Sequence, residues 1–233
     1  MIGSGFFRRL SRIAADMRSQ YGLLTAFGLF TIRSLARLSG GTVLACMHKP
    51  VGQVEQCSGR LLTRAEIERA SANPTLDLPA EFVASIQSAQ CYGIVVDGDV
   101  RCYAWTAAGP VRAVPGTVVT MSSESAYVFK AFTDPALRGR GLLRECLNAV
   151  EQGAVRGGRT EMSALVEIHN RSSLRAFRNA GFTRCGLVFV LRRPWLISKL
   201  SCSCAAPCTW SRDIRTAPAS AFHSSSEIFA RRG

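Results

Sequence analysis

The sequence predicts an α/β fold in which strands and helices alternate over residues 41–198. Three observations indicate this. A β-prone run at 127–133 leads through a glycine-rich turn into a helical pattern at 142–150. A second strand pattern followed by a helical pattern occupies 163–182 and ends in a glycine stop. Residues 92–106 alternate in two runs around an Asp-Gly-Asp turn, which favours a β-hairpin.

Three further elements precede the hairpin. The run TVLACM within residues 41–49 predicts a strand. A helical pattern follows at 61–70, where Thr63 and Glu66 have the spacing of a capping box. Residues 79–89 form a second helical pattern. The expected order is therefore strand, two helices, hairpin, strand, helix, strand and helix.

The turn between the central strand and the helix at 142–150 suits anion binding. The first amides of a helix have no intrahelical partner and lie at the positive end of its dipole. Gly139 and Gly141 let a phosphate approach the backbone, and Arg138 and Arg140 add positive charge. The turn is neither a Walker loop nor a dinucleotide fingerprint, because neither spacing is present. It therefore predicts a pyrophosphate site, with an ordinary strand-to-helix loop as the alternative.

Together with the later segment, this turn resembles the GNAT superfamily of acyl-coenzyme A dependent N-acetyltransferases. The family pattern Arg/Gln-x-x-Gly-x-Gly/Ala is matched by Arg138, Gly141 and, imperfectly, Leu143. Its later Asn, followed by a helix that ends in Gly-Phe, is matched by Asn170 and by residues 181–182. Either motif alone is weak, whereas both in this order and separation are fairly specific.

The resemblance covers roughly residues 60–193 and is strongest over 126–182. It implies a single mixed, mostly antiparallel sheet flanked by helices, which is the GNAT-like acyltransferase fold. It also implies that acetyl-CoA or another acyl-CoA is the co-substrate and that the acceptor is an amine of a small molecule or peptide.

The resemblance also implies where the coenzyme binds. A backbone amide near the end of the central strand would bind the thioester carbonyl, and the following turn would hold the pyrophosphate. Asn170 would face the pantetheine, although a helix N-cap is an equally good explanation of it. The implied coenzyme residues are Phe132, Thr133, Arg138, Gly139, Arg140, Gly141, Leu142, Leu143, Asn170 and Ser173.

The proton donor for the leaving thiolate departs from the family pattern. Many members have a Tyr on the last helix, where this chain has Phe177, which cannot donate a proton. Water or a neighbouring Ser such as Ser173 replaces it, or no general acid acts, or the fold has kept coenzyme binding and lost turnover. Two functions therefore remain: an N-acyltransferase that acts by direct attack, and a non-catalytic module that senses acyl-CoA or binds another protein.

The general base is equally open. Glu124 precedes the central strand, and Glu167 and His169 end the next one. We take Glu124 and Glu167 as catalytic candidates, because an amine attacks only in its neutral form. The alternatives are a solvated surface carboxylate and a histidine that only closes a turn.

The acceptor is expected near residues 107–125, a loop rich in Gly, Pro, Ser and Thr. Tyr103, Trp105 and Tyr127 would form the floor of its pocket if they were exposed there. Aromatic residues at alternating strand positions more often belong to a core. The sequence therefore does not identify the acceptor.

Charge and composition divide the chain into three parts. Of the net charge of +13, residues 1–40 carry +5 (six Arg against one Asp), residues 41–198 carry +5, and residues 199–233 carry +3. We expect a helical extension over 1–40, the GNAT-like domain over 41–198 and a disordered tail over 199–233. Such a charge favours anionic partners in general, and we expect no nucleic-acid partner. The oligomeric state is not predicted.

Nine cysteines are present, an odd number. Six stand singly among apolar neighbours, which suits free thiols in a reducing compartment and predicts a cytoplasmic location: Cys46, Cys57, Cys91, Cys102, Cys146 and Cys185. The other three, at 202–208, lack a fourth ligand at zinc spacing, so no metal site is expected.

Residues 1–40 begin with a basic amphipathic helix. One face carries Phe6, Phe7, Leu10, Ile13, Ala14 and Met17, and the arginines lie largely elsewhere. The apolar run at 21–32 is too short to span a bilayer. The segment predicts either an anchor on an anionic membrane surface or a helical hairpin packed on the domain, and it also resembles a targeting peptide.

Overall fold

The computed structural model describes residues 42–52, 57–86, 89–114, 117–190, 197–202 and 209–212. Its strands are β1 (Thr42–Pro50), β2 (Arg60–Leu61), β3 (Ala89–Val96), β4 (Asp99–Ala107), β5 (Val111–Val114), β6 (Thr117–Thr120), β7 (Ser125–Thr133), β8 (Glu161–Glu167), β9 (Thr183–Val190), β10 (Ile197–Cys202) and β11 (Thr209–Arg212). Its helices are α3 (Arg64–Ser71), α4 (Ala80–Ser85), α5 (Leu142–Arg156) and α6 (Arg171–Asn179), with a short 3-10 helix η1 (Pro135–Leu137).

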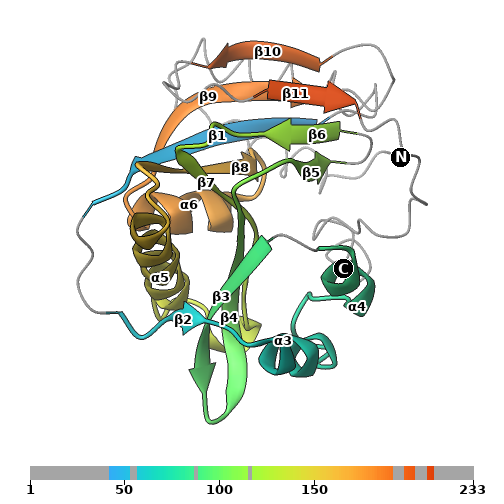
Figure 1. Cartoon of the computed structure of the whole chain (residues 1–233), viewed down its shortest axis with the longest axis vertical. Helices are drawn as coiled ribbons and strands as arrows, with labels where there is room; N and C mark the ends of the chain where they lie inside the picture. The colour runs from blue at the N-terminus through green and yellow to red at the C-terminus, as the bar shows by residue number, and fades with distance from the viewer. Residues whose placement is uncertain are drawn as a thin grey trace, which may run out of the picture.

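Eight strands form one sheet in the order β10-β9-β1-β8-β7-β4-β3-β2 (Figure 1). Only β7 and β8 run parallel, and every other neighbouring pair is antiparallel. The parallel pair requires a crossover connection, and α5 provides it. The predicted fold, a mixed and mostly antiparallel sheet flanked by helices, is confirmed. The expected extension over 1–40 lies outside the described residues.

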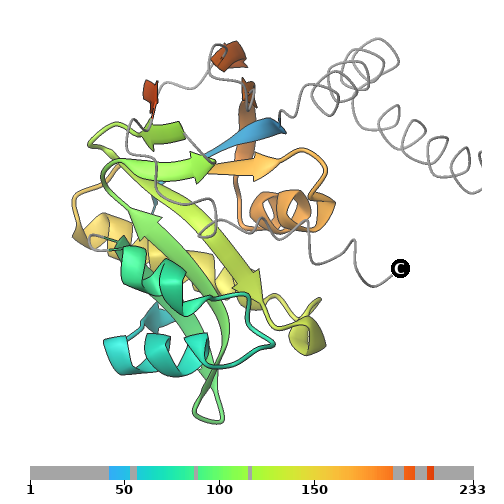
Figure 2. The same cartoon turned by 90° about the vertical axis from the view of Figure 1, so that its right-hand side faces the viewer.

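The helices cover the two faces of this sheet. In Figure 1, α5 lies to the left of β3 and β4, and α3 and α4 lie to the right; after the 90° turn of Figure 2, α3 and α4 face the viewer. On the α5 side, the core joins residues such as Leu147 and Val150 to Leu174 and Phe177 of α6. On the other side, a core rich in aromatic residues packs Phe82 of α4 against β4 and β7.

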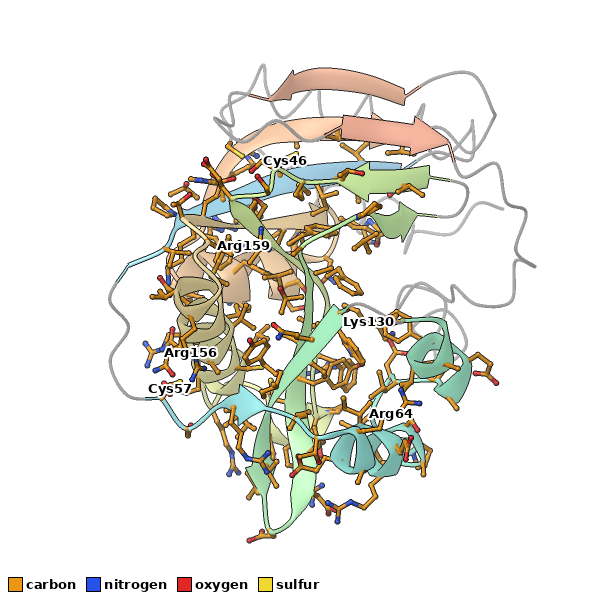
Figure 3. All side chains as sticks on the ribbon, viewed as in Figure 1. Cys46, Cys57, Arg64, Lys130, Arg156 and Arg159 are labelled. Carbon is orange, nitrogen blue, oxygen red and sulfur yellow. The ribbon has the colours of Figure 1, made fainter. Side chains whose placement is uncertain are left out.

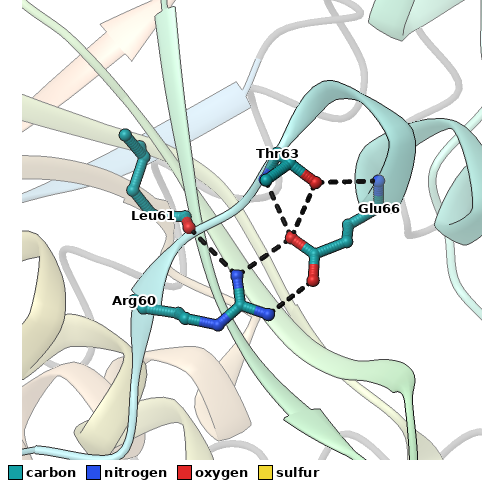
Figure 4. A network of polar contacts seen from close by, with 4 residues as sticks. All are labelled: Arg60, Leu61, Thr63 and Glu66. Atoms are coloured by element: carbon teal, nitrogen blue, oxygen red, sulfur yellow. Dashed lines mark hydrogen bonds and ion pairs between the residues drawn. The ribbon is translucent and has the colours of Figure 1, made fainter.

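Helix α3 begins where the capping box was predicted. The Thr63 hydroxyl accepts a hydrogen bond from the Glu66 amide, and the Glu66 carboxylate accepts one from the Thr63 amide at 2.9 Å. Arg60 of β2 donates to both carboxylate oxygens of Glu66, at 2.9 and 2.5 Å (Figure 4). These Arg60 bonds, with those from Thr63, lower the pKa of Glu66 from 4.5 to about 2. The side chain therefore closes the helix end and ties it to the sheet edge.

Two predicted segments differ from the structure. The helix expected over 79–89 ends at Ser85, because Ile86 is extended and Ala89 already belongs to β3. The loop expected over 107–125 contains β5 and β6, which form a separate three-stranded sheet with β11. Four consecutive β-branched residues at 117–120 carry the strand signal that the loop composition obscured.

The stretch after 198, expected as a tail, contains two strands. β10 pairs with β9 and crosses the predicted domain limit, and β11 pairs with β6. Residues 203–208 and 213–233 lie outside the described part of the chain. The division into extension, domain and tail stays a prediction.

The cysteines mostly follow the prediction. Free thiols are found at Cys46, Cys57, Cys91, Cys102 and Cys146. Burial raises the pKa of Cys91, so this thiol is neutral at physiological pH. Cys185 was expected to be free and is instead disulfide-bonded. The side chains of the three cysteines at 202–208 are not among those described.

Candidate functional site

The site is built around the point where β7 and β8 separate. Their parallel pairing runs from Ser125 opposite Glu161 to Val128 opposite Ala164, and then stops. Beyond it, β7 continues to pair only with β4. A β-bulge lies at the same place, since Ala131 and Phe129 are opposite consecutive residues of β4 and Lys130 between them has φ 40°. The bulge bends β7 away from β8 and opens the sheet.

The register shows which amides of β7 face this opening. The Asp134 amide donates to the Arg101 carbonyl at 2.8 Å, so Asp134 points toward β4. Because antiparallel strands alternate, Phe132 points the same way, and Ala131 and Thr133 point to the other edge. The Thr133 carbonyl confirms this orientation, since it accepts from Arg138 Nε at 3.3 Å. Of the predicted pair, Thr133 therefore presents its amide to the opening and Phe132 does not.

The turn after β7 has the geometry of an anion site. Asp134 starts it, with one carboxylate oxygen accepting from the Ala136 amide at 3.0 Å and the other from Arg101 at 3.2 Å. Gly139 and Gly141 have φ of 81° and 79°, which a residue with a Cβ adopts only with strain, and a Cβ built on either would meet nothing within 4 Å. The space beside both glycines is thus open.

The first amides of α5 complete the turn. Gly141 is the N-cap and offers no side chain, and the first helical hydrogen bond runs from the Glu145 amide to the Gly141 carbonyl. Within the described residues, the amides of Leu142, Leu143 and Arg144 have no backbone acceptor. They lie at the positive end of a 15-residue helix. The guanidinium of Arg138 lies 5.5 Å from the centre of the Phe132 ring, which keeps this positive charge beside the opening.

Asn170 and Ser173 lie at the start of α6. The Asn170 side chain accepts from the Ser173 amide at 3.1 Å and from the Ser172 hydroxyl at 2.9 Å. Asn170 is therefore the N-cap of α6, as the alternative explanation held. Its side-chain oxygen Oδ1 already accepts these two hydrogen bonds. Ser173 is partly exposed in the first turn of the helix.

Phe177 lies one turn after Ser173 on α6 and faces inward. It is 5% exposed and meets Phe182 edge to face, with ring centres 5.0 Å apart. A side chain in this place contributes to packing between α6 and the sheet. It has no hydroxyl for the leaving thiolate, as the sequence indicated.

The two candidate carboxylates lie at opposite ends of the strands. Glu124 is exposed just before β7, and its carbonyl accepts from the amides of Thr160 and Glu161. The nine residues of β7 place it roughly 30 Å from Thr133. Glu167 ends β8, at the same end of the parallel pair as Thr133, and forms an ion pair with His169. The structure brings Glu167 to the opening and not Glu124.

The aromatic candidates for an acceptor floor belong to the core. Tyr103, Trp105 and Tyr127 are at most 3% exposed. Trp105 Nε1 is buried without a hydrogen-bond partner among the described residues. These side chains shape the sheet face behind the opening and do not present a surface of their own.

Sequence reasoning missed Lys130. Its Nζ lies 3.2 Å from an Asp77 carboxylate oxygen and 5.0 Å from the centre of the Phe82 ring. Figure 3 shows Lys130 on the side of the strands that faces α4. The residue thus connects the bulge to the segment between α3 and α4. Nothing in the local sequence marks it, because a single lysine in a β-prone run usually points to solvent.

Comparison with known proteins identifies the fold. The family model for the acetyltransferase (GNAT) family matches residues 64–182, just over half of the chain. The chain belongs to this family. No curated protein matches the sequence.

Three solved acetyltransferase structures match parts of this chain. A putative acetyltransferase from Novosphingobium aromaticivorans is 20% identical over 69% of this chain, with a TM-score of 0.48, and the chain spans 66% of that protein. Aminoglycoside N-acetyltransferase AAC(6')-Iy, solved with the bisubstrate analogue CoA-S-monomethyl-acetylneamine, is 18% identical over 56% of this chain and 92% of its own, with a TM-score of 0.43. An aminoglycoside acetyltransferase from a soil metagenome, bound to sisomicin, is 11% identical over 52% of this chain and 85% of its own, with a TM-score of 0.38.

Two features are absent from the described residues. No group of three or more His, Cys, Asp or Glu side chains is placed to hold a metal ion in the ranges given above. No helix in that part of the GNAT chain is long and apolar enough to span a membrane.

Proposed function

We propose that this GNAT protein transfers an acetyl or other short acyl group from coenzyme A to a primary amine by direct attack. The observation that carries the proposal is the opening between β7 and β8, which begins at the Lys130 bulge and adjoins the glycine turn before α5. A pyrophosphate on the first amides of α5 would leave the pantetheine in reach of the Ala131 and Thr133 amides.

The chemistry of acyl transfer suits this geometry. The tetrahedral adduct carries an oxyanion, and a fixed backbone amide stabilises it at no cost of reorganisation during the reaction. The amides of Ala131 and Thr133 face the opening, and Arg138 brings a positive charge to the coenzyme side. Holding the thioester in the opening also converts a bimolecular step into an attack at fixed geometry.

Calorimetry with acetyl-CoA tests the first step of this proposal. We expect the full chain to bind acetyl-CoA, and Gly141→Trp to abolish binding because an indole would fill the space beside the turn. Gly98→Trp is the matched control. Gly98 also has a left-handed φ, 83°, and open space around it, but it lies in the β3–β4 turn. Absence of binding to the wild type at millimolar acetyl-CoA would contradict the proposal.

The acceptor is an amine of a small molecule or a peptide. Detection of free thiol with a panel of monoamines, amino sugars, amino acids and peptides would identify the class. The free thiols of the described residues favour a cytoplasmic location, whereas the disulfide at Cys185 points the other way. Association with an anionic membrane through residues 1–40 is proposed on sequence grounds alone.

A second candidate function follows from Phe177. Its buried ring supplies no proton donor where many family members have one, so a module that binds acyl-CoA without turnover is the alternative. Such a module would bind acetyl-CoA tightly and release no thiol with any amine of the panel. Thiol release at ordinary enzymatic rates by the wild type, unchanged in Phe177→Tyr, would eliminate it.

A further inference from the structure

Glu167 and His169 form an ion pair at the end of β8. The His169 Nε2 atom lies 3.0 Å from Glu167 Oε2, and the two side chains are 38% and 29% exposed. The backbone around the pair is also held, since the Glu167 carbonyl accepts from the Asn170 amide at 2.9 Å and the His169 carbonyl from the Arg171 amide at 3.0 Å. The imidazole therefore lies beside a carboxylate, on a locally held backbone, and is reachable from solvent.

The pair lies beside the opening that would hold the thioester. Glu161 is opposite Ser125 in the parallel register, so Glu167, six residues later, is level with residues 131–132 of β7. On its other side β8 pairs with β1, where Leu44 is opposite Glu167. Beyond Ala164, β8 has no strand partner on the β7 side among the described residues. Glu167 thus lies at the mouth of the opening.

The pair also lies on the face that an amine would approach. Side chains alternate along β8, so Glu167 shares a face with Leu165, which packs against the buried cluster that contains Tyr127. This face is opposite α5, whose first turn would hold the pyrophosphate. A coenzyme that enters from the α5 side leaves the opposite face of the carbonyl to the nucleophile.

We infer that His169 Nδ1 is the base that accepts the proton of the acceptor ammonium, and that Glu167 positions the imidazole. The inference rests on the proposed acyltransferase function and deepens it. Nε2 lies within ion-pair distance of the Glu167 carboxylate, so Nδ1 is the ring nitrogen left open to the acceptor. Nδ1 has no partner among the described residues.

The proton and electron balance is complete without a further reagent. The ammonium gives one proton to His169 Nδ1, and the freed nitrogen lone pair forms the C–N bond to the thioester carbonyl. The C–S bond then breaks, and its electron pair leaves with sulfur. The second proton lost from nitrogen neutralises the thiolate, and the proton on His169 returns to solvent. No residue at the position of Phe177 has to donate.

The chain contains a matched control pair. His48 Nε2 lies 2.9 Å from Glu161 Oε2, with side chains 21% and 13% exposed. Glu161 begins β8, so this pair lies about 20 Å from Glu167 at the opposite end of the strand. Removing His48 breaks a histidine–glutamate contact of similar length and leaves the opening untouched.

The test measures thiol release from acetyl-CoA by the full chain with the amine panel described above. Loss of a general base lowers the rate by about 100-fold or more, so His169→Ala should lower kcat/KM by that factor, with acetyl-CoA affinity unchanged in calorimetry. Added imidazole should restore part of the His169→Ala rate. Glu167→Gln should lower kcat with little change in KM, and His48→Ala should retain the wild-type rate.

The outcomes separate this inference from the proposed function. Wild-type turnover that His169→Ala retains in full would overturn the role of His169 and leave the acyltransferase proposal standing. A rate lost in His169→Ala but not restored by imidazole, together with weaker acetyl-CoA binding, would assign the residue a structural role and overturn the inference. Absence of thiol release by the wild type with every amine would overturn both.

Discussion

Single residues decide where this sheet opens, and Lys130 is the main one. Its φ of 40° is left-handed, a conformation that costs a residue with a Cβ about 1–2 kcal/mol. The strain is offset by two contacts, the ion pair with Asp77 and the approach to the Phe82 ring. Asp77 is held in turn by Tyr103, whose hydroxyl donates to the Asp77 carbonyl. The bulge is therefore fixed from the side of α3 and α4.

This strain predicts an unusual order of stabilities. Glycine in a strand is normally less stable than alanine by about 0.5–1 kcal/mol. At position 130 the order should reverse, with Lys130→Gly more stable than Lys130→Ala by about 0.5–1 kcal/mol, because only alanine keeps the left-handed strain. Urea unfolding of both variants measures the difference. The neighbouring Phe129→Gly and Phe129→Ala pair, without a left-handed φ, should show the normal order; the same order at both positions would refute the strain.

The features of the site that the sequence predicted are those that depend on neighbouring residues in the chain. The glycine turn, the Thr63 cap and the Asn170 cap are local, so their residues reveal them. The bulge is not local, because it depends on which residues of β4 lie opposite Ala131 and Phe129. For the same reason the sequence proposed Phe132 together with Thr133, whose amides point to opposite edges.

At the scale of elements, the direction of the strands distinguishes the two candidate bases. Both Glu124 and Glu167 adjoin a strand in the sequence, but one precedes β7 and the other follows β8. In a parallel pair, residues before one strand and after the other lie at opposite ends. The sequence predicted the strands, yet only the pairing of β7 with β8 shows that Glu167 alone reaches the opening.

Helix α5 supplies the anion site, and its close packing on the sheet depends on Gly153. A Cβ built there would lie 1.9 Å from Tyr92 Oη, so the glycine lets the helix approach β3. Gly153→Ala should raise helix propensity by about 1 kcal/mol but overpack this contact, which typically costs about 1–3 kcal/mol. We expect a lower melting temperature and weaker acetyl-CoA binding as the first turn of α5 shifts. Gly109→Ala, where nothing lies within 4 Å, is the control; equal melting of the two variants would contradict the close approach.

At the scale of the whole molecule, positive charge is distributed unevenly. The chain carries 29 Lys and Arg against 16 Asp and Glu, and residues 1–40 contribute six Arg and one Asp. Within the described domain many arginines are paired, as in Arg60 with Glu66 and Arg64 with Glu68. We therefore expect the net charge of +5 in the first 40 residues to contribute most to attraction to an anionic surface.

The last prediction concerns these 40 residues, which lie outside the described part of the chain. If they form an interfacial anchor, each Arg near an anionic surface contributes about 1 kcal/mol, and this part of the binding falls as salt rises. The apolar face that includes Phe6, Phe7 and Leu10 should contribute a part of the binding that does not fall as salt rises. Full-length protein should then sediment with anionic vesicles, and removal of residues 1–40 should abolish sedimentation while acetyl-CoA binding stays intact.

A charge variant separates the two parts of this attraction. Replacement of Arg8, Arg9, Arg12 and Arg18 by Gln keeps the apolar face, so it should remove the salt-sensitive fraction of sedimentation and leave the salt-resistant one. Full-length protein that ignores anionic vesicles at low salt would rule out the anchor. A truncated protein that melts lower than the full chain would instead show that the segment covers apolar surface of its own domain, because that surface would then be exposed to water.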